Sequence, residues 1–174
     1  MPEPESLVDE VSAAVAPRLL LLTGERNAGK TRWCGRACDA ARAAGLDVAG
    51  LISPPVYAGN DRVGIDLLNA ATGERRQLAQ RLPPGEAGTA GLRWRFDART
   101  LAWGNAVMRS IRACDLLFVD ELGPLEFRGD GGFLAAFDAI AARRYRLAVA
   151  VIRPSLLEAA CARWPWRHRI CDQE

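Results

Sequence analysis

The sequence predicts an α/β fold in which a mainly parallel β-sheet is covered by helices. Short continuous apolar runs, the pattern of buried parallel strands, recur along the chain. Segments with apolar residues at helical spacing lie between these runs. The length of 174 residues, of which 49% are hydrophobic and 25% charged, suits one domain with a sizeable core.

The N-terminal part of the chain divides into a leader and the first elements of the domain. Residues 1–17 contain Glu and Pro and are weakly patterned, which predicts a flexible leader with a helical turn near 8–15. They lack the basic start of a secretion signal. We expect residues 18–174 to form a single domain. Its first elements are a strand at residues 18–23, a helix at 31–44 that ends at Gly45, and a second strand at 46–52.

Residues 53–97 differ in character, because Gly, Pro and Asn interrupt short segments there. Residues 58–61 and 71–74 have the composition of hairpin turns. We therefore expect a hairpin-rich insert that extends the main sheet with antiparallel strands. Residues 81–91 contain Pro83-Pro84-Gly85 and predict a mobile loop.

Regular alternation of helices and strands resumes after the insert. Residue 154 is Pro, which suits the first turn of a helix. The remaining elements are predicted as helices at 98–113, 132–142 and 154–162, buried strands at 115–119 and 147–152, and a last edge strand at 164–170.

The charge balance and the residue counts exclude several classes of function. A net charge of +2, from 23 basic and 21 acidic side chains, argues against a nucleic-acid partner. No apolar run approaches the roughly 20 residues of a membrane span. The single histidine, His168, excludes a metal site with several histidine ligands. The five cysteines lack metal-finger spacing, which predicts reduced thiols and a cytoplasmic location.

Cys34 and Cys38 lie four residues apart on the helix predicted at 31–44. They either pack as small residues against the core or form a two-thiol metal or redox site. No other ligand types accompany them, and this favours packing.

Lys30 is the single lysine of the chain, and the other basic residues are arginines. It belongs to Gly24-Glu25-Arg26-Asn27-Ala28-Gly29-Lys30-Thr31, which has the Gly-x-x-x-x-Gly-Lys-Thr pattern of the Walker A phosphate loop. Gly24 and Gly29 let backbone N–H groups wrap a phosphate, toward which the following helix turns its positive end. Lys30 is a compact point charge for the β- and γ-phosphates, a role that the wider Arg head does not fill. We expect all eight residues to bind nucleotide, and Thr31 also to contact Mg²⁺.

A second motif ends the strand predicted at 115–119. Leu116-Leu117-Phe118-Val119-Asp120-Glu121 has the pattern of Walker B, in which apolar residues lead to an Asp at the carboxyl edge of a sheet. Asp120 would hold Mg²⁺. Glu121 would orient and deprotonate the water that attacks the γ-phosphate, the work of a catalytic base.

The order of the two motifs indicates a subdivision of the fold. The long separation between Lys30 and Asp120 leaves room for at least one strand between the two motif strands. Together with a Glu directly after the Asp, this spacing predicts a RecA-like P-loop domain rather than the kinase and GTPase division.

These motifs resemble the small nucleoside-triphosphatase family known from thermophiles and, in animals, as cancer-related nucleoside-triphosphatase. The resemblance covers about residues 18–157. Besides the phosphate loop, it rests on Asp120-Glu121-Leu122-Gly123-Pro124-Leu125-Glu126, similar to the family's Asp-Glu-Ile-Gly-Pro-Met-Glu. It implies a single RecA-like domain that hydrolyses ATP, GTP and other nucleoside triphosphates with Mg²⁺.

The chain departs from the family pattern in three places. Arg26-Asn27 replaces the usual Pro-Gly of the phosphate loop, and Pro54-Pro55 replaces a Thr-Glu pair. The C-terminal portion is shorter and contains Trp164-Pro165-Trp166. The sequence is therefore similar to a divergent branch, and the family's substrate preference is not carried over.

Several side chains near the motifs have two interpretations. Arg26 either contacts phosphate or reaches solvent, and Arg153 either senses the γ-phosphate or is a solvated arginine. Glu126 either assists the water or binds a partner arginine, or it is structural, the interpretation that we favour. The segment Arg93-Trp94-Arg95 could stack a base, but packing of the tryptophan is favoured.

The motifs together predict a Mg²⁺-dependent nucleoside triphosphatase that acts on ATP, GTP or both. Two alternatives stay open. A nucleoside or nucleotide kinase would need an acceptor pocket and an arginine-bearing lid, for which residues 81–99 are the candidate. A nucleotide-dependent switch or assembly factor would need a protein partner.

Overall fold

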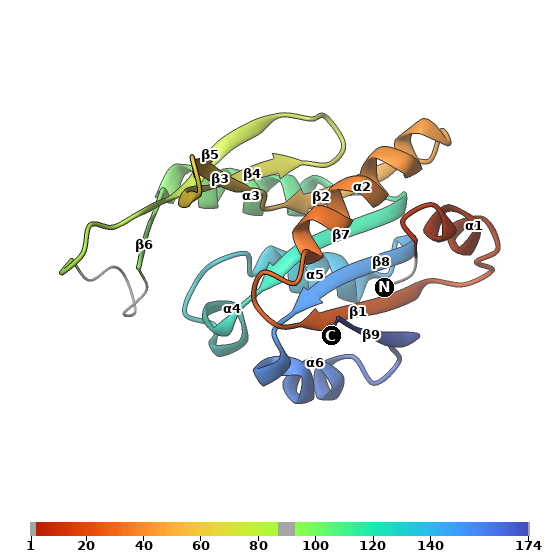
Figure 1. Ribbon diagram of the computed structural model, residues 1–174. Coiled ribbons are helices and arrows are strands. Elements are labelled where there is room, and N and C mark those ends of the chain that lie inside the picture. The colour runs from red at the N-terminus through yellow and green to blue at the C-terminus, as the bar shows by residue number, and fades with distance from the viewer. Residues whose placement is uncertain (1–2, 87–92, 174) are drawn as a thin grey trace.

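The computed structural model describes residues 3–86 and 93–173 of the chain (Figure 1). The α-helices are α1 (Ser6–Ser12), α2 (Lys30–Ala43), α3 (Ala98–Ser110), α4 (Pro124–Arg128), α5 (Ala135–Ala142) and α6 (Leu157–Arg163). The strands are β1 (Arg18–Gly24), β2 (Val48–Ile52), β3 (Pro55–Ala58), β4 (Asp61–Asn69), β5 (Arg75–Arg81), β6 (Trp94–Phe96), β7 (Cys114–Leu122), β8 (Tyr145–Ile152) and β9 (Arg169–Gln173). Within the described ranges, none of the helices is long and apolar enough to cross a membrane.

All these strands belong to one mixed sheet. Its order is β6-β5-β4-β2-β7-β8-β1-β9, with β3 paired to β4 outside this path. From β2 to β9, neighbouring strands are parallel. β4 pairs antiparallel with β2, and β3, β5 and β6 continue the sheet with antiparallel pairs. The predicted α/β class, with a mainly parallel sheet and an antiparallel hairpin extension, is confirmed.

β8 lies between the two motif strands. Leu22 of β1 pairs with Val151 of β8, and Val119 of β7 pairs with Ala150 on its other side. The strand that we expected between the Walker A and Walker B strands is therefore present, and the sheet order is consistent with a RecA-like domain.

The central strands are buried on both faces because their sequences are apolar without interruption. In β1, Leu20 and Leu22 join the core cluster that contains Trp33 of α2, whereas Leu19 and Leu21 join the cluster that contains Phe137 of α5. Figure 1 shows α1 and α2 on one face of the sheet and α3 and α5 on the other. The parallel strands consequently end together at one edge of the sheet, where ligands bind in open α/β folds.

The described residues 3–17 differ from the flexible leader that we expected at 1–17. Ser6–Ser12 forms α1, and its Leu7 and Val11 are fully buried in the core cluster of Trp33. Glu10 of this helix accepts a hydrogen bond of 2.6 Å from Nη2 of Arg169 in β9. The two apolar side chains are one helical turn apart, so even this seven-residue helix presents an apolar face to the core.

Other element boundaries also differ from the sequence prediction. β7 continues to Leu122 instead of ending at residue 119, and α5 begins at Ala135 instead of 132. The five-residue helix α4 was not predicted, because one turn is too short to show a periodic pattern. The last edge strand is present, but it lies at Arg169–Gln173 and not at 164–170. Trp164, which we expected to begin this strand, is only 2% exposed and packs in the core, where it anchors the turn before β9.

The insert has the predicted hairpins. β3 and β4 are joined by the turn at 59–60, and β4 and β5 by the turn that contains Gly73. Residues 87–91 of the loop expected at 81–91 lie outside the described residues. β6 pairs with β5 through Ala79↔Phe96, which places it at the edge of the sheet.

Candidate functional site

The predicted phosphate loop connects β1 to α2. Gly24 (φ 134°), Asn27 (φ 65°) and Gly29 (φ 88°) all have positive φ, and Gly29 is the residue before α2. Glycine adopts such a backbone without a steric penalty, and Asn tolerates it better than most residues. The loop therefore turns sharply enough for the 14-residue helix α2 to begin directly beside it. The N–H groups and the positive end of the helix make this place suitable for an anion.

Side chains of the loop itself point largely to solvent. Glu25, Arg26 and Asn27 are exposed, whereas Ala28 is half-buried and its N–H donates to the Glu25 carbonyl at 3.3 Å. Arg26 is exposed, as the interpretation that its side chain reaches solvent required. The loop thus presents mainly backbone groups toward its interior.

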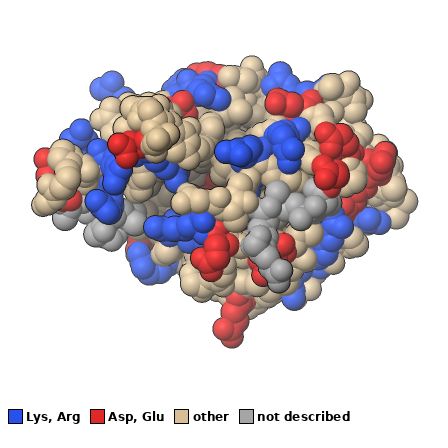
Figure 2. Space-filling model, in the orientation of Figure 1, with Lys and Arg blue, Asp and Glu red and all other residues tan. Residues whose placement is uncertain are grey.

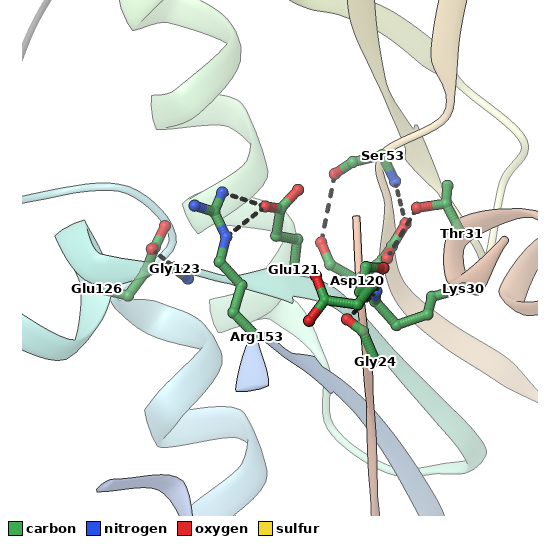
Figure 3. A network of polar contacts seen from close by, with 10 residues as sticks. Gly24, Lys30, Thr31, Ser53, Asp120, Glu121, Gly123, Glu126 and Arg153 are labelled. Atoms are coloured by element: carbon green, nitrogen blue, oxygen red, sulfur yellow. Dashed lines mark hydrogen bonds and ion pairs between the residues drawn. The ribbon is translucent and has the colours of Figure 1, made fainter. Parts of the chain in front are cut away.

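Lys30 reaches back into the phosphate loop (Figure 3). Its Nζ donates hydrogen bonds of 2.6 Å to the carbonyl oxygens of Gly24 and of Glu25. These bonds hold the ammonium against the backbone of the loop, where a positive charge would meet phosphate oxygens.

Asp120 is buried at the carboxyl edge of the sheet, with 3% of its surface exposed. Its Oδ1 accepts a hydrogen bond of 3.2 Å from Thr31 Oγ1, and its Oδ2 accepts one of 3.0 Å from the backbone N–H of Ser53. Ser53 Oγ also donates to the Asp120 carbonyl at 3.4 Å. Burial raises the pKa of the Asp120 carboxyl from 3.8 to about 6, against the opposing effect of its hydrogen bonds.

The oxygen atoms around Asp120 suit a small divalent cation. The Thr31 hydroxyl and the Asp120 carboxylate are hard oxygen donors of the kind that Mg²⁺ prefers, and Mg²⁺ usually binds one or two carboxylates with water and phosphate oxygens. Among the residues that the structure describes, no group of three or more His, Cys, Asp or Glu side chains could hold a metal ion. A cation at this edge would therefore use Thr31, Asp120 and the oxygens of a bound ligand.

Glu121 lies at a bulge in β7. Val119 pairs with Ala150 and Leu122 with Ile152, so that two residues of β7 lie opposite one residue of β8. Glu121 has φ 72°, in the left-handed region. Bulges redirect side chains, and here the buried Asp120 and the exposed Glu121 point to different places in Figure 3. The Glu121 carboxylate accepts hydrogen bonds from Arg153, one of them from Nε at 3.0 Å.

A comparison with protein-family models matches residues 19–163 to a family described as NTPase. The chain belongs to this NTPase family. The match includes the phosphate loop, residues 116–121 and most of the sheet, so the resemblance inferred from the motifs is confirmed.

Archaeal relatives support the assignment to the NTPase family. A nucleoside-triphosphatase THEP1 of Methanothermobacter thermautotrophicus is 30% identical over 139 residues, which are 79% of this chain and 78% of that protein. The same-named protein of Methanopyrus kandleri is 27% identical over 115 residues. That alignment covers 66% of this chain but 62% of the relative, somewhat less than two thirds of its length.

A solved structure supports the fold of this NTPase-family chain. The solution structure of a human cancer-related nucleoside triphosphatase superimposes with a TM-score of 0.62 at 20% sequence identity. The superposition covers 89% of this chain and 87% of the human one. At this identity the likeness concerns the fold, and the site is argued from this chain's own residues.

Glu126 fastens the segment that follows Glu121. Its Oε2 accepts a hydrogen bond of 2.8 Å from Gly123 N–H, and its Oε1 accepts one of 2.9 Å from Phe133 N–H. The side chain is 8% exposed, and burial raises its pKa. Gly132 has φ 77°, and a Cβ there would lie 1.8 Å from Glu126 Oε1, so glycine is needed for this approach. These contacts favour the structural interpretation of Glu126.

Two arginines of the antiparallel extension stack on tryptophans. The Arg62 guanidinium lies 5.2 Å from the ring centroid of Trp94, and Arg76 lies 4.3 Å from that of Trp103. Arg95 instead donates a hydrogen bond of 3.3 Å to Gln80. Figure 2 shows basic side chains over this part of the molecule, on the left of the view. Because Arg62 and the core already contact Trp94, packing is favoured over base stacking.

Cys34 and Cys38 lie on the inner face of α2. Cys34 is 0% exposed and Cys38 3% exposed, and both belong to the core cluster of Trp33. Burial raises the pKa of both thiols, which keeps them protonated near neutral pH. Their surroundings are those of small packing residues.

The structure adds one residue that the sequence argument missed. Ser53 contacts Asp120 through both its backbone and its side chain. Its position in the sequence could have indicated this role. Ser53 directly follows β2, and the parallel strands β2 and β7 end at the same edge of the sheet.

Proposed function

We propose that this chain is a Mg²⁺-dependent nucleoside triphosphatase that hydrolyses the γ-phosphate of ATP, GTP or both. The convergence of Lys30, Thr31, Asp120 and Glu121 at one edge of the sheet carries this proposal. The phosphate loop offers backbone N–H groups and a lysine for a polyanion, and the Asp120 carboxylate accepts a hydrogen bond from Thr31 at the end of the loop. The NTPase family and the names of the archaeal relatives support the same activity.

Each residue has a distinct task in this reaction. Residues 24–31 wrap the β- and γ-phosphates, and Lys30 offsets their negative charge. Thr31 and Asp120 would hold Mg²⁺, which when bound neutralises charge on the phosphate oxygens. Glu121 orients a water molecule and accepts its proton as the water oxygen attacks the γ-phosphorus and the bond to the β-phosphate oxygen breaks. A positioned base of this kind contributes about 10²–10⁴-fold to the rate.

The proposed location is the cytoplasm. All five cysteines are free in the structure, and two of the buried ones, Cys34 and Cys38, lie on α2. Unpaired thiols are typical of proteins that work in a reducing compartment.

The experiment is a comparison of phosphate release from ATP, GTP, CTP and UTP, with Mg²⁺ or with EDTA, and with or without nucleoside and nucleotide acceptors. We expect release that requires Mg²⁺ and is not increased by any acceptor. Transfer of radiolabelled phosphate to an acceptor would instead indicate a kinase. A single slow turnover with retained product and a co-purifying partner would indicate a switch.

The Glu121→Gln variant tests the role of the carboxylate. Gln keeps the shape and can accept one hydrogen bond, but it cannot take the proton of water. We expect turnover to fall by about 10²-fold or more, while affinity for a non-hydrolysable triphosphate stays close to that of the parent. Glu158→Gln, which changes an exposed carboxylate on α6, is the matched control and should keep parental turnover. Parental turnover in Glu121→Gln would exclude Glu121 as the base.

A further inference from the structure

Arg153 and Glu121 form an ion pair at the carboxyl edge of the sheet (Figure 3). Nε and Nη2 of Arg153 both donate to the same oxygen, Oε1 of Glu121, with the Nε bond at 3.0 Å. The side chains are 31% and 43% exposed, respectively. A pair as exposed as this adds little to folding stability in general, so its geometry is of greater interest than its energy.

The backbone on the arginine side is fixed by its neighbours. Arg153 directly follows β8 and precedes Pro154, and a residue before proline is restricted to extended conformations. Its φ of −68° and ψ of 145° fit that restriction. Its carbonyl also accepts a hydrogen bond of 2.9 Å from Leu156 N–H, which closes the turn that follows.

The backbone on the glutamate side is held in an unfavourable conformation. A side chain such as that of Glu rarely takes the φ of 72° seen at Glu121, and strained positions of this kind cluster at functional sites. The paired strand β8 on one side and the Glu126 contacts to Gly123 and Phe133 on the other hold this part of the chain. The carboxylate is therefore presented from a fixed backbone, and Arg153 fixes the remaining side-chain rotations.

The position of β8 determines where Arg153 can act. Because β8 lies between β1 and β7, its end emerges between the phosphate loop and the Asp120-Glu121 segment. The hydrogen bonds from Arg153 go to Glu121 Oε1. The second carboxylate oxygen, Oε2, is the one through which Glu121 could meet a water molecule.

We propose that Arg153 is a positioning residue for hydrolysis, which holds Glu121 through Oε1 so that Oε2 receives the proton of the attacking water. This inference rests on the proposed function, because it needs Glu121 to be the base. It differs from direct sensing of the γ-phosphate, in which Arg153 would act without Glu121. Misplacement of a reacting group by about 1 Å can reduce rates by about 10²-fold, so loss of the pair has a measurable effect.

The test is a double-mutant cycle on the full chain. Phosphate release and affinity for a non-hydrolysable triphosphate are measured for the parent, Arg153→Ala, Glu121→Gln and the double variant, with Arg153→Lys as the conservative variant. Arg128→Ala is the matched control, since it removes an exposed arginine paired with Asp130 on the neighbouring helix end. Unchanged nucleotide affinity reports that each variant is folded.

We expect Arg153→Ala to lower kcat by about 10–100-fold, with KM and nucleotide affinity within about threefold of the parent, and Arg153→Lys to recover part of the loss. In the Glu121→Gln background the Arg153→Ala change should alter kcat by less than about twofold, because the two side chains act as a unit. Arg128→Ala should behave as the parent does.

Four results would overturn the inference. An unchanged kcat in Arg153→Ala would show that the contact is a surface ion pair only. An equal loss in both Glu121 backgrounds, with a selective loss of triphosphate over diphosphate affinity, would show direct phosphate contact instead. Absent hydrolysis in the parent, or parental turnover in Glu121→Gln, would overturn the proposed function itself and this inference with it.

Discussion

Thr31 donates a hydrogen bond of 3.2 Å to Oδ1 of Asp120, although 89 positions separate the two residues along the chain. The bond joins the first turn of α2 to the end of β7, and thereby the two halves of the proposed nucleotide site. Asp120 is also the most deeply buried carboxylate of this site, and that burial has a measurable cost.

The stability of the chain without Mg²⁺ should depend on the charge of Asp120. Because the pKa is raised from 3.8 to about 6, the folded state binds more protons than the unfolded state in this interval, and stability falls as pH rises through it. Asn at this position carries no charge, and its amide can still face the Ser53 N–H and the Thr31 hydroxyl, which accepts as well as donates. In EDTA at pH 8, Asp120→Asn should be more stable than the parent by up to about 3 kcal/mol.

Thermal or urea unfolding at several pH values checks the Asp120 prediction. The advantage of Asp120→Asn should shrink as pH is lowered from 6 toward 4, and a variant less stable than the parent at pH 8 would contradict it. The same variant should lose most of the Mg²⁺ dependence of nucleotide affinity, since a neutral amide is a poorer ligand for this cation.

Substitution of Lys30 should abolish hydrolysis. Lys30→Ala removes the charge near the loop, and we expect loss of turnover and of most phosphate-dependent affinity. Lys30→Arg should also fail, because a planar guanidinium is too wide for the place where Nζ lies 2.6 Å from two carbonyl oxygens. Phosphate release and nucleotide titrations measure both effects. An active Lys30→Arg enzyme would remove the argument that this single lysine is required.

Substitution of Glu126 should lower the free energy of unfolding rather than remove a group that takes part in hydrolysis. Glu126→Ala leaves the N–H groups of Gly123 and Phe133 without their acceptor in a buried place, which should cost about 2 kcal/mol or more. Glu126→Gln keeps one acceptor oxygen and should lose about half as much. Chemical denaturation measures the difference. If Glu126→Gln is instead as stable as the parent and loses its turnover, Glu126 takes part in the reaction.

Cys34 and Cys38 should be dispensable for hydrolysis. The double alanine variant removes two buried sulfur atoms from the core, which should reduce stability by about 1–2 kcal/mol. Its phosphate release should stay within a few-fold of the parent, because neither thiol lies in the proposed site. Metal analysis of the purified protein provides the second measurement. Stoichiometric metal that is lost in the variant would show that the pair is a ligand site.

The sequence was most informative where its pattern was long. Uninterrupted apolar runs predicted β1, β8 and the central part of β7, and helical spacing predicted α2 and α3. Each of these elements is long enough to repeat its pattern several times. The one-turn helix α4 and the seven-residue α1 were harder, because their formation depends on caps and burial. Gly123-Pro124 with Glu126 at the third helical position was a usable local signal for α4.

For the candidate site, the motifs predicted which residues gather but not how their side chains are paired. Lys30, Thr31 and Asp120 come together as the spacing of the two motifs indicated. Ser53 was missed, because a serine after a strand has no distinctive pattern. The contact between Arg153 and Glu121 depends on the bulge in β7 and on strand order, neither of which the local sequence encodes.

The place of β1 in the sheet has a consequence for how the chain folds. β1 comes early in the chain, but its neighbours in the sheet are β8 and β9, the last two strands to be synthesised. Until residues 145–173 leave the ribosome, the apolar run at 18–23 has no partner on either side, and such unpaired strands are prone to aggregate. Pairing across so long a loop is also slow. The phosphate loop therefore acquires its shape at the end of folding, and refolding should restore nucleotide binding later than helix content.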